Sequence, residues 1–551
     1  MESIDYGRLA ELLFPDVTET PDDMEKKYPP RELPAEAKVT RFAPSPTGFV
    51  HFGGLFPTRV SERLAHQSGG VFYLRIEDTD AKREVEGAEE NLIGTLQNYG
   101  IVFDEGALPG GSEKGAYGPY RQSERKAIYH VFAKDLVKRG FAYPCFCTEE
   151  ELTAIRAEQE AVKADPGYYG KWAVWRDAPI EKITEKLDAG EAFVLRFRSV
   201  GNIEHKMKFT DLVKGQVEIT ENDRDHVLLK SDGIPTYHFA HAVDDHLMRT
   251  THVVRGEEWL SSLPFHIQLF SALGFKLPKY LHISQLMKLE GNSKKKLSKR
   301  DHGVDMRWYD AHGYASEALT EYVMTLLNSN FEEWRAANPT APFEDFAFTV
   351  KKMSTSGCLL DMDKLADVSK NTISRMTSEQ VYDKTLAWAK LYDEEFAVLL
   401  ESDPDYAKRI LSIGRGGNKP RKDLATWSDV KPYMEFFYDE LYSVQDEYPD
   451  KFDPEDIKNI LLGFASSYDE TEDSSQWFDG VKTLADKNGF CPDMKQYKKN
   501  PSVFKGSVAD VSMFLRVAVT GKQNSPDLYE VMHLLGYKRV IARINAVAAS
   551  L

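Results

Sequence analysis

The sequence is poor in cysteine and lacks a long hydrophobic run. Its 551 residues include four cysteines, Cys145, Cys147, Cys358 and Cys491. So few cysteines in so long a chain exclude a disulfide framework and favour a reducing compartment. No apolar stretch reaches the roughly 18 residues that a membrane-spanning helix needs. The first forty residues are rich in acids, unlike a secretory signal or an arginine-rich transit peptide. We therefore expect a cytoplasmic protein.

Basic residues are fewer than acidic ones, which gives a formal net charge of −17. An acidic chain can still bind nucleic acid, because a local basic stripe is enough to contact phosphates. The acidity can equally serve solubility alone. Apolar residues make up 42% and charged residues 28%, which is ordinary for a globular protein. The length suggests about three to five domains.

The segment that follows an N-terminal extension has the pattern of a nucleotide-binding βαβ unit. Residues 38–43 and 71–76 are strand-like, and residues 55–67 between them have a helical pattern. The Gly/Pro loop before that helix would lie at the carboxyl edge of a parallel sheet, where ligands bind. Residues 6–14 predict one helix in the extension, followed by a proline-rich connector.

Two separate segments have features suited to a nucleotide triphosphate. In the first, Gly53 and Gly54 let a base or phosphate approach the backbone, and His51 can stabilise charge on a phosphoryl oxygen. The second segment, residues 294–300, carries five cations in seven residues. Alone, such a run is typical of a solvated basic loop. Together, the two segments predict a cradle for the nucleotide and mobile cations for its phosphates.

These segments resemble the two signatures of class I aminoacyl-tRNA synthetases. His51-Phe52-Gly53-Gly54 corresponds to the HIGH motif, and Lys296-Leu297-Ser298-Lys299-Arg300 to the KMSKS motif. The finer resemblance, from about residue 38 to 551, is to bacterial-type glutamyl-tRNA synthetases. It rests on the stretches at residues 41–48, 74–80, 231–238, 254–259 and 515–521. The glutaminyl relatives differ in their opening motif.

The resemblance implies an amino-acid pocket suited to glutamate. Arginine forks can hold the two carboxylates of glutamate, a glutamate side chain its ammonium group, and a tyrosine hydroxyl can add a neutral donor. His241 stands where relatives often carry asparagine. The implied glutamate-binding residues are Arg41, Ala43, Ser45, Glu77, Tyr237, His241 and Arg255.

The resemblance also implies ATP, with Mg²⁺ on its phosphates, as the second substrate. His51 and Lys299 are the expected catalytic residues, because both can stabilise charge that develops on the phosphates. Trp259 equally fits a core position. The implied ATP-binding residues are Thr47, Gly53, Gly54, Glu258, Trp259, Met287, Lys296 and Lys299.

Some relatives bind zinc through a Cys-x-Cys pair, a tyrosine and a later cysteine. Here Cys145 and Cys147 form the pair, and Tyr168 or Tyr169 matches the tyrosine. Trp172 stands where the last cysteine is expected. Because a structural zinc site needs four good ligands, we predict that no metal is bound.

The C-terminal half offers a basic stretch for tRNA. Residues 408–422 contain six cations and no acid. Arg421 resembles the residue with which the family reads the third anticodon base, although a solvated basic loop explains the stretch as well. Single-stranded anticodon bases are typically read by stacking and by hydrogen bonds to their edges.

The expected fold class is α/β: a Rossmann-type parallel-sheet catalytic domain with an inserted α+β acceptor-binding domain, followed by an all-α anticodon-binding region. The expected protein is a monomeric glutamate–tRNA ligase whose partners are tRNA(Glu), L-glutamate and ATP. A nondiscriminating enzyme that also charges tRNA(Gln), or a catalytically silent tRNA-binding relative, remains open. The predicted segments are 1–37, 38–140, 141–230, 231–285, 286–370 and 371–551.

Overall fold

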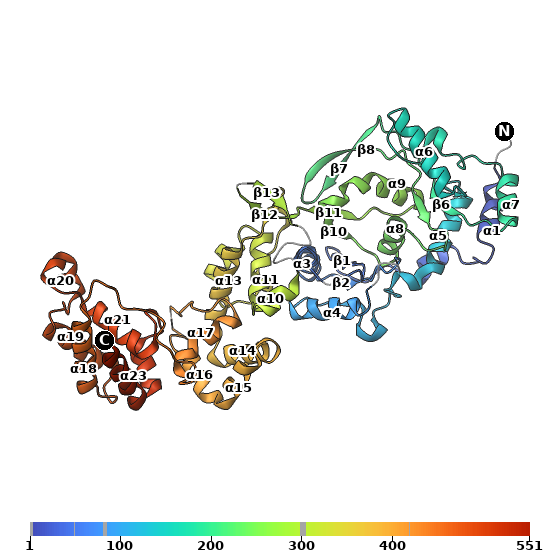
Figure 1. Cartoon of the computed structure of the whole chain (residues 1–551). Coiled ribbons are helices and arrows are strands. Elements are labelled where there is room, and N and C mark those ends of the chain that lie inside the picture. Colours follow the sequence, from blue (N-terminus) through green and yellow to red (C-terminus); the bar gives the residue numbers. More distant parts are fainter. Residues whose placement is uncertain (1–3, 49, 81–84, 292, 298–304, 418) are drawn as a thin grey trace. The chain divides into compact units, whose positions relative to one another are not determined.

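The computed structural model describes residues 4–48, 50–80, 85–291, 293–297, 305–417 and 419–551. The chain forms two compact units, each with its own core. The first comprises Met1–Met306 and Thr320–Asp361, and the second Arg307–Leu319 and Met362–Leu551. Figure 1 colours both units along the sequence. The predicted division into six segments stays a prediction.

A parallel sheet lies at the centre of the first unit (Figure 1). One part of it holds three parallel strands and an antiparallel edge strand, namely β1 (Val39–Phe42), β2 (Val71–Leu74), β3 (Glu105–Ala107) and β4 (Glu113–Lys114). The other part is the parallel pair β10 (His252–Gly256) and β11 (Lys279–Ile283). The amide of Thr251 donates to the carbonyl of Val39, which places β10 beside β1. The predicted Rossmann-type sheet is therefore confirmed.

Helices cover both faces of this sheet. Thr40 donates through its hydroxyl to the carbonyl of Ser61 in α3 (Phe52–His66), whereas the next residue, Arg41, reaches Asp245 in α8 (Tyr237–Leu247). Because neighbouring strand residues point to opposite faces, α3 and α8 lie on opposite sides of β1. Other helices of this unit include α4 (Ala88–Asn98), α5 (Lys126–Lys138) and α9 (Leu263–Leu273).

A mixed region is inserted between the two parts of the sheet. A three-stranded antiparallel sheet, a hairpin and two helices form it: β5 (Ala142–Cys145), β6 (Val194–Phe197), β9 (Val227–Leu229), β7 (Lys206–Asp211), β8 (Gly215–Thr220), α6 (Glu149–Ala161) and α7 (Ile180–Asp188). Thr148 and Glu151 begin α6 with a reciprocal capping box. The hairpin contacts β11, so the insertion reaches back to the central sheet.

The N-terminal extension is more ordered than the sequence pattern predicts. Besides the expected helix α1 (Tyr6–Leu13), it forms α2 (Pro21–Lys27), and both pack on α5. The side chains of Thr20 and Asp23 form a capping box at the start of α2, and Pro21 takes the first helical position. These residues are typical of a helix start, whereas the proline-rich composition predicted a connector here instead of a second helix.

A small sheet lies next to the second half of the central sheet in sequence. It consists of β12 (Leu286–Glu290), β13 (Ser293–Lys296) and β14 (Cys358–Leu359), with β12 in the middle. Between β13 and β14 the chain forms α10 (Met306–Ala311), α11 (Ser316–Leu327) and α12 (Phe331–Ala337). Among the described residues after 305, β14 is the one strand between helices.

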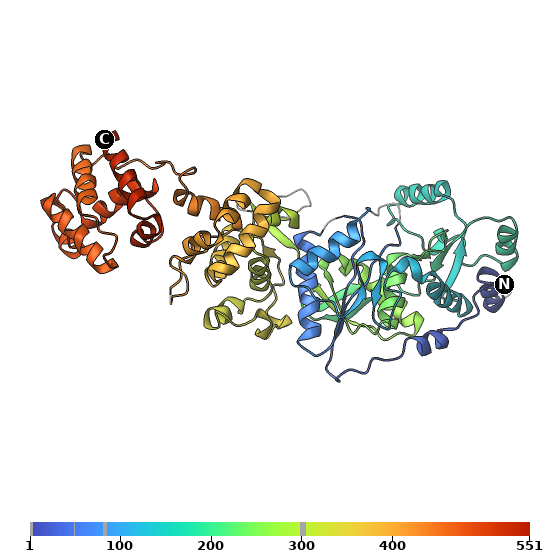
Figure 2. The same cartoon turned by 90° about the horizontal axis from the view of Figure 1, so that it is seen from below.

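The second unit is built from short helices (Figure 2). They are α13 (Met362–Ser374), α14 (Ser378–Tyr392), α15 (Glu394–Ser402), α16 (Pro404–Ser412), α17 (Val430–Met434), α18 (Pro454–Ser467), α19 (Ser474–Lys487), α20 (Met494–Lys499), α21 (Val508–Thr520), α22 (Leu528–Leu535) and α23 (Tyr537–Ser550). Apolar side chains such as Ile410, Phe514 and Ile544 form its core. Among the described residues of the whole chain, every helix is too short or too polar to cross a bilayer.

Candidate active site

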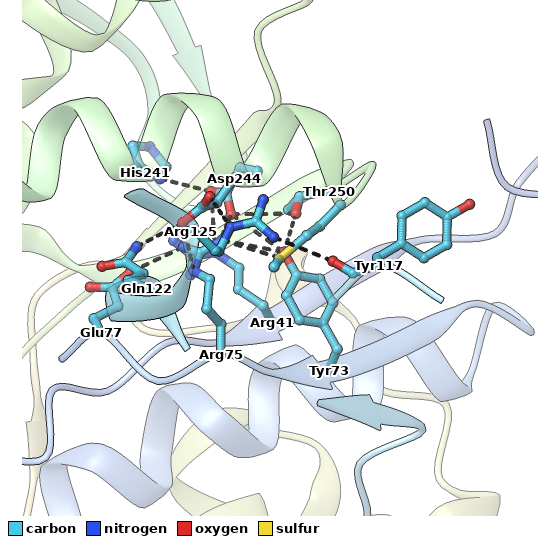
Figure 3. A network of polar contacts seen from close by, with 12 residues as sticks. Arg41, Tyr73, Arg75, Glu77, Tyr117, Gln122, Arg125, His241, Asp244 and Thr250 are labelled. Carbon is cyan, nitrogen blue, oxygen red and sulfur yellow. Dashed lines mark hydrogen bonds and ion pairs between the residues drawn. The ribbon is translucent and has the colours of Figure 1, made fainter. Parts of the chain in front are cut away.

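A network of buried charges lies beneath the predicted glutamate pocket (Figure 3). Arg41 contacts both carboxylate oxygens of Asp245 through Nε at 3.3 Å, and Arg75 donates to Asp245 at 2.7 Å. A second terminal nitrogen of Arg75 donates to Glu77 at 3.0 Å. Arg41 also donates to the carbonyl of Val254 at 3.3 Å, directly before Arg255. Asp245 therefore fixes two arginines at once and links them to Glu77.

The cations control the protonation of Asp245. Burial alone would raise the pKa of this carboxyl group, but Arg41 and Arg75 outweigh burial and hold the pKa well below its usual range. For Glu77 burial prevails, so that its pKa is raised although Arg75 and Arg41 oppose the shift. A cationic ammonium group placed beside Glu77 would favour its ionised form.

Asp244 supports the same network from the neighbouring position. Its carboxylate accepts from Arg125 at 2.7 Å, from the amide of Gln122 at 2.9 Å and from the hydroxyl of Tyr129 at 2.9 Å. All these side chains are buried. Asp244 and Asp245, which are adjacent in α8, thus hold side chains from β1, β2 and α5. These contacts restrict the motion of the side chains beneath the pocket.

Tyr237 is half-buried against the rings of His241 and Trp259, in the electrostatic field of three charged pocket residues. Burial raises the pKa of its hydroxyl, Arg255 and Arg41 oppose the shift, and Glu77 adds to it, so all three act on this group. The ring of Tyr237 lies parallel to that of His241, with centroids 5.7 Å apart. Arg41, Glu77 and Arg255 are thus buried in this part of the first unit, Tyr237 is half-buried, and the role of all four in binding glutamate stays a prediction.

His241 is completely buried behind Tyr237. Its Nδ1 lies 2.7 Å from Asp245, and its Nε2 is hydrogen-bonded to the hydroxyl of Tyr280 at 2.9 Å. Burial lowers the pKa of His241 to about 4 despite the neighbouring carboxylate, so that the imidazole is neutral near pH 7. Its contacts are those of a residue that supports Tyr237 and Asp245.

The opening loop contributes backbone groups at the pocket. The carbonyl of Pro44 accepts from the amide of Glu77 at 2.9 Å, which joins the loop after β1 to the end of β2. Ala43 is half-buried beside this contact, while Ser45 and Thr47 are exposed. The amide of Thr47 donates back to the carbonyl of Ser45 at 2.8 Å.

A separate cavity of about 310 Å³ lies at the start of α3. His51 is the residue immediately before this helix, so its side chain stands at the positive end of the helix dipole. A Cβ atom on Gly53 would lie 3.1 Å from Nδ1 of His51, which is tight. The absence of a side chain at Gly53 thus leaves room for the imidazole. The lining residues include His51, Gly53, Gly256, Glu258, Ser284 and Lys296.

Other predicted ATP-binding residues are spread over α3, β12 and the amino-acid pocket. Gly54 follows in the first turn of α3. Met287 lies in β12 next to the lining residue Leu286, and its carbonyl accepts from the amide of Leu360. Trp259 packs against Tyr237, with ring centroids 4.4 Å apart, and thus lies at the amino-acid pocket. Lys299 lies outside the described residues. The ATP assignments stay predictions.

The Cys-x-Cys pair meets Tyr168 rather than Tyr169. The hydroxyl of Tyr168 lies 3.5 Å from the sulfur of Cys145 and 3.6 Å from that of Cys147, whereas Tyr169 donates to the carbonyl of Asp165. Three such side chains do not complete a tetrahedral zinc site. The described residues contain no cluster of three or more histidine, cysteine or acidic side chains placed to hold a metal.

In the second unit, Arg421 lines a cavity of about 510 Å³. It donates to Asp423 through Nε at 2.6 Å and remains about two-fifths exposed. Gly414 takes a positive φ of 68°, and a Cβ there would lie 2.6 Å from Cδ of Arg421. By contrast, Arg415 donates to the carbonyls of Leu411 and Ile373, so this cation of the basic stretch serves the fold.

Family comparison agrees with this architecture. The model of "tRNA synthetases class I (E and Q), catalytic domain" matches residues 38–365, which is more than half of the chain. The chain belongs to this family. A second model, "Anticodon binding domain", matches residues 395–548 of this class I synthetase. The recognised fold class and enzyme class are thereby confirmed.

Individual relatives cover the synthetase almost from end to end. A curated glutamate–tRNA ligase of Acetivibrio thermocellus is 50% identical over 98% of this chain and 100% of its own length. One of Sorangium cellulosum is 46% identical over 97% of this chain and 99% of its own. The crystal structure of a glutamate tRNA ligase from Elizabethkingia meningosepticum with its amino acid is 28% identical, with a TM-score of 0.71 over 94% of this chain and 100% of that one.

Several residues of the site escaped the sequence interpretation. They support the named pocket residues from behind, and they are Arg75, Asp211, Asp244, Asp245, His266, Tyr280 and His282. One signal was available: Asp244 and Asp245 are adjacent acids in an otherwise largely apolar helix, where charge is rare unless paired. The partners of these acids come from distant strands and could not be read from spacing.

Proposed function

We propose that this synthetase joins L-glutamate to the 3′ end of tRNA(Glu) at the expense of ATP. The observation that carries the proposal is a set of buried contacts: Arg41 and Arg75 share Asp245, Arg75 also holds Glu77, and Arg41 donates to the carbonyl directly before Arg255. Two buried guanidinium groups suit two carboxylates, and the buried carboxyl group of Glu77 suits one ammonium group. Glutamate is the amino acid with that set of charges.

The proposed reaction has two steps. A carboxylate oxygen of glutamate attacks the α-phosphorus of ATP and releases pyrophosphate, which gives glutamyl-adenylate. A ribose hydroxyl of the terminal tRNA nucleotide then attacks the acyl carbon, and AMP leaves. Neither step needs a protein nucleophile, so positioning and charge stabilisation account for the rate.

His51 is the described residue best placed for the first step. It stands at the N-terminus of α3 and lines the cavity with Lys296, so an imidazole, a helix dipole and an ammonium group act on the same space. Lys299 is proposed as a second catalytic cation. ATP enters as its Mg²⁺ complex, and the proposed reaction does not use zinc.

The inserted region contacts the acceptor end, and Arg421 contacts the anticodon from its cavity in the second unit, where Lys370, Tyr433 and Lys522 are further lining residues. Cations with an aromatic ring suit an unstacked base and its phosphates. The enzyme acts as a cytoplasmic monomer.

The decisive experiment is a charging assay. Purified protein is incubated with ATP, labelled glutamate and either tRNA(Glu) or tRNA(Gln), each purified. The proposal expects charging of tRNA(Glu) only. Charging of both would establish the nondiscriminating form. No charging of either, with intact folding verified by circular dichroism, would refute the enzymatic function and favour a silent tRNA-binding relative.

A further inference from the structure

The two pocket arginines are held by different kinds of group. Arg41 faces the carboxylate of Asp245. Arg255 instead donates through Nε to Nε2 of His282 at 2.9 Å and through Nη1 to Nδ1 of His266 at 3.0 Å. The guanidinium of Arg255 also lies over the ring of Tyr280, 4.5 Å from its centre. Within the described part of the chain, no carboxylate forms an ion pair with Arg255.

The hydrogen bonds fix the protonation of both imidazoles. A guanidinium group has only N–H donors, so the ring nitrogen that faces it must be an unprotonated acceptor. His282 must then carry its hydrogen on Nδ1, which lies 2.7 Å from Asp211. His266 must carry its hydrogen on Nε2, which lies 2.8 Å from Nδ1 of His238. Both histidines are therefore neutral and each adopts one tautomer.

Asp211 is itself held in place at the end of β7. Its Oδ1 accepts from the amides of Val213 and Lys214 at 2.9 and 2.8 Å, and its Oδ2 accepts from the amide of His282 at 3.1 Å. The carboxylate of Asp211 thus reaches the arginine only through an imidazole. The negative charge orients the ring but does not neutralise the cation directly.

A buried cation without a counterion is costly unless a ligand supplies the charge. Arg255 is 6% exposed, and neutral imidazoles satisfy two of its donors without cancelling its charge. A ligand carboxylate would cancel that charge, whereas the isosteric amide would not. His282 and His266 also hold the guanidinium group of Arg255 in one orientation, because Asp211 and His238 fix their rings.

We propose that His266 and His282 are positioning residues that keep Arg255 an uncompensated cation and thereby make the pocket select a carboxylate over an amide. The selection is that of glutamate over glutamine. This inference rests on the proposed function. It assigns the discrimination to neutral imidazoles behind the arginine, in addition to the arginine itself.

The most direct test compares two variants of His266 whose side chains have nearly the same shape but differ in charge. His266→Asn keeps a neutral oxygen near the position of Nδ1, and His266→Asp places a charged oxygen there. The KM for glutamate and kcat are measured in tRNA charging at saturating ATP. We expect the KM of the Asp variant to exceed that of the Asn variant by about tenfold, with kcat changed much less, because a counterion would compete with the substrate. Discrimination against glutamine should fall in parallel.

Equal KM values for the two variants would overturn the proposal. Should His266→Asp fail to fold, as judged by thermal unfolding, His282→Gln and His282→Leu give the answer instead. Glutamine retains an acceptor near the position of Nε2, and leucine removes it. We expect a raised KM for the leucine variant alone, and a similar KM for both would equally overturn the proposal.

The controls separate this inference from the proposed function. His252→Asn changes a buried histidine of the same strand as Arg255, whose ring is hydrogen-bonded to the hydroxyl of Thr251. Its KM should match that of the wild type. Wild-type protein that does not attach glutamate to any tRNA refutes the function itself. An active wild type, together with the same KM for His266→Asp and His266→Asn, refutes only the role of the imidazoles.

Discussion

The first unit buries charged side chains beneath its pocket, whereas the core of the second unit is apolar. Arg41, Arg75 and Asp245 are each at most 5% exposed, and the arginines find their counterion inside the protein. In the second unit, Arg421 pairs with Asp423 in the lining of a cavity, where both side chains are partly exposed. Buried charges are rigid and strong because water does not screen them, while exposed ones are weak and depend on salt. A small-molecule pocket needs the first arrangement, and an RNA surface that must release its ligand suits the second.

The largest expected effect comes from removing the shared counterion. Asp245→Ala leaves Arg41 and Arg75 buried without it, which should lower the free energy of unfolding by about 3–5 kcal/mol. Urea denaturation followed by circular dichroism measures this change. Asp479→Ala, which breaks an exposed pair with Lys482, serves as the control and should cost less than about 0.5 kcal/mol. Similar losses in both variants would contradict the contrast between the two units.

The next effect concerns catalysis at the start of α3. His51→Ala should lower the rate of glutamate activation by about a hundred- to a thousandfold, because one group that stabilises the phosphates is lost. Pyrophosphate exchange in the presence of tRNA measures the rate, and filter binding measures tRNA affinity, which should not change. His66→Ala at the far end of the same helix is the control. An undiminished rate in the His51 variant would show that its proposed role is wrong.

A smaller effect is expected at the open cavity of the second unit. Arg421→Ala should raise the KM for tRNA by about tenfold and leave the KM for glutamate unchanged, because only an RNA contact is lost. Arg409→Ala removes an exposed cation outside the cavity lining and is the matched control. Gly414→Ala should resemble the Arg421 variant, since its Cβ would displace the arginine stem. Equal effects of the Arg409 and Arg421 variants would favour a general solvated basic surface.

The smallest effect tests a partly exposed pair in the first unit. His66 lies 3.1 Å from Asp104, which also accepts a hydrogen bond from the amide of Phe72. The hydrogen bond to Asp104 raises the pKa of His66 above its ordinary value of 6.5. The stabilisation is therefore fully present below about pH 6.5 and is lost as the pH rises through the folded-state pKa.

Comparison of the wild type with His66→Gln at pH 5.5 and pH 8.5 checks this sign. The difference in free energy of unfolding should stay below about 1 kcal/mol, because solvent screens the pair, and should be larger at pH 5.5. A larger difference at pH 8.5 would mean that the neutral form of the ring is the stabilising one.

The sequence predicted the first βαβ unit, where periodicity and turn residues agree. The strand, glycine loop and helix around His51 are local in sequence, so their pattern identifies them. The second helix of the N-terminal extension was missed. Its capping residues are a short signal that does not stand out from loop composition.

For the pocket, sequence motifs predicted Arg41, Glu77, Tyr237 and Arg255 but not what holds them. Asp245 lies 204 residues after Arg41, and Asp211 lies 71 residues before His282. No local pattern connects residues so far apart. The position of Trp259 against Tyr237 likewise depends on the contact between the short turn Glu257–Ser262 and the start of α8, which the motif around Arg255 does not specify.

By itself, the sequence determined the local elements around the motifs and the residue types that are available: two motif segments for a nucleotide, two arginines for carboxylates, and a basic stretch for RNA. Tertiary structure alone decided how those charges are compensated. It gave Arg41 a carboxylate and Arg255 two imidazoles, and it turned Arg415 toward backbone carbonyls while Arg421 stayed at a cavity. The physical reason is that the strength of a charge depends on burial and on its partners, and both are set by segments that meet only in the folded chain.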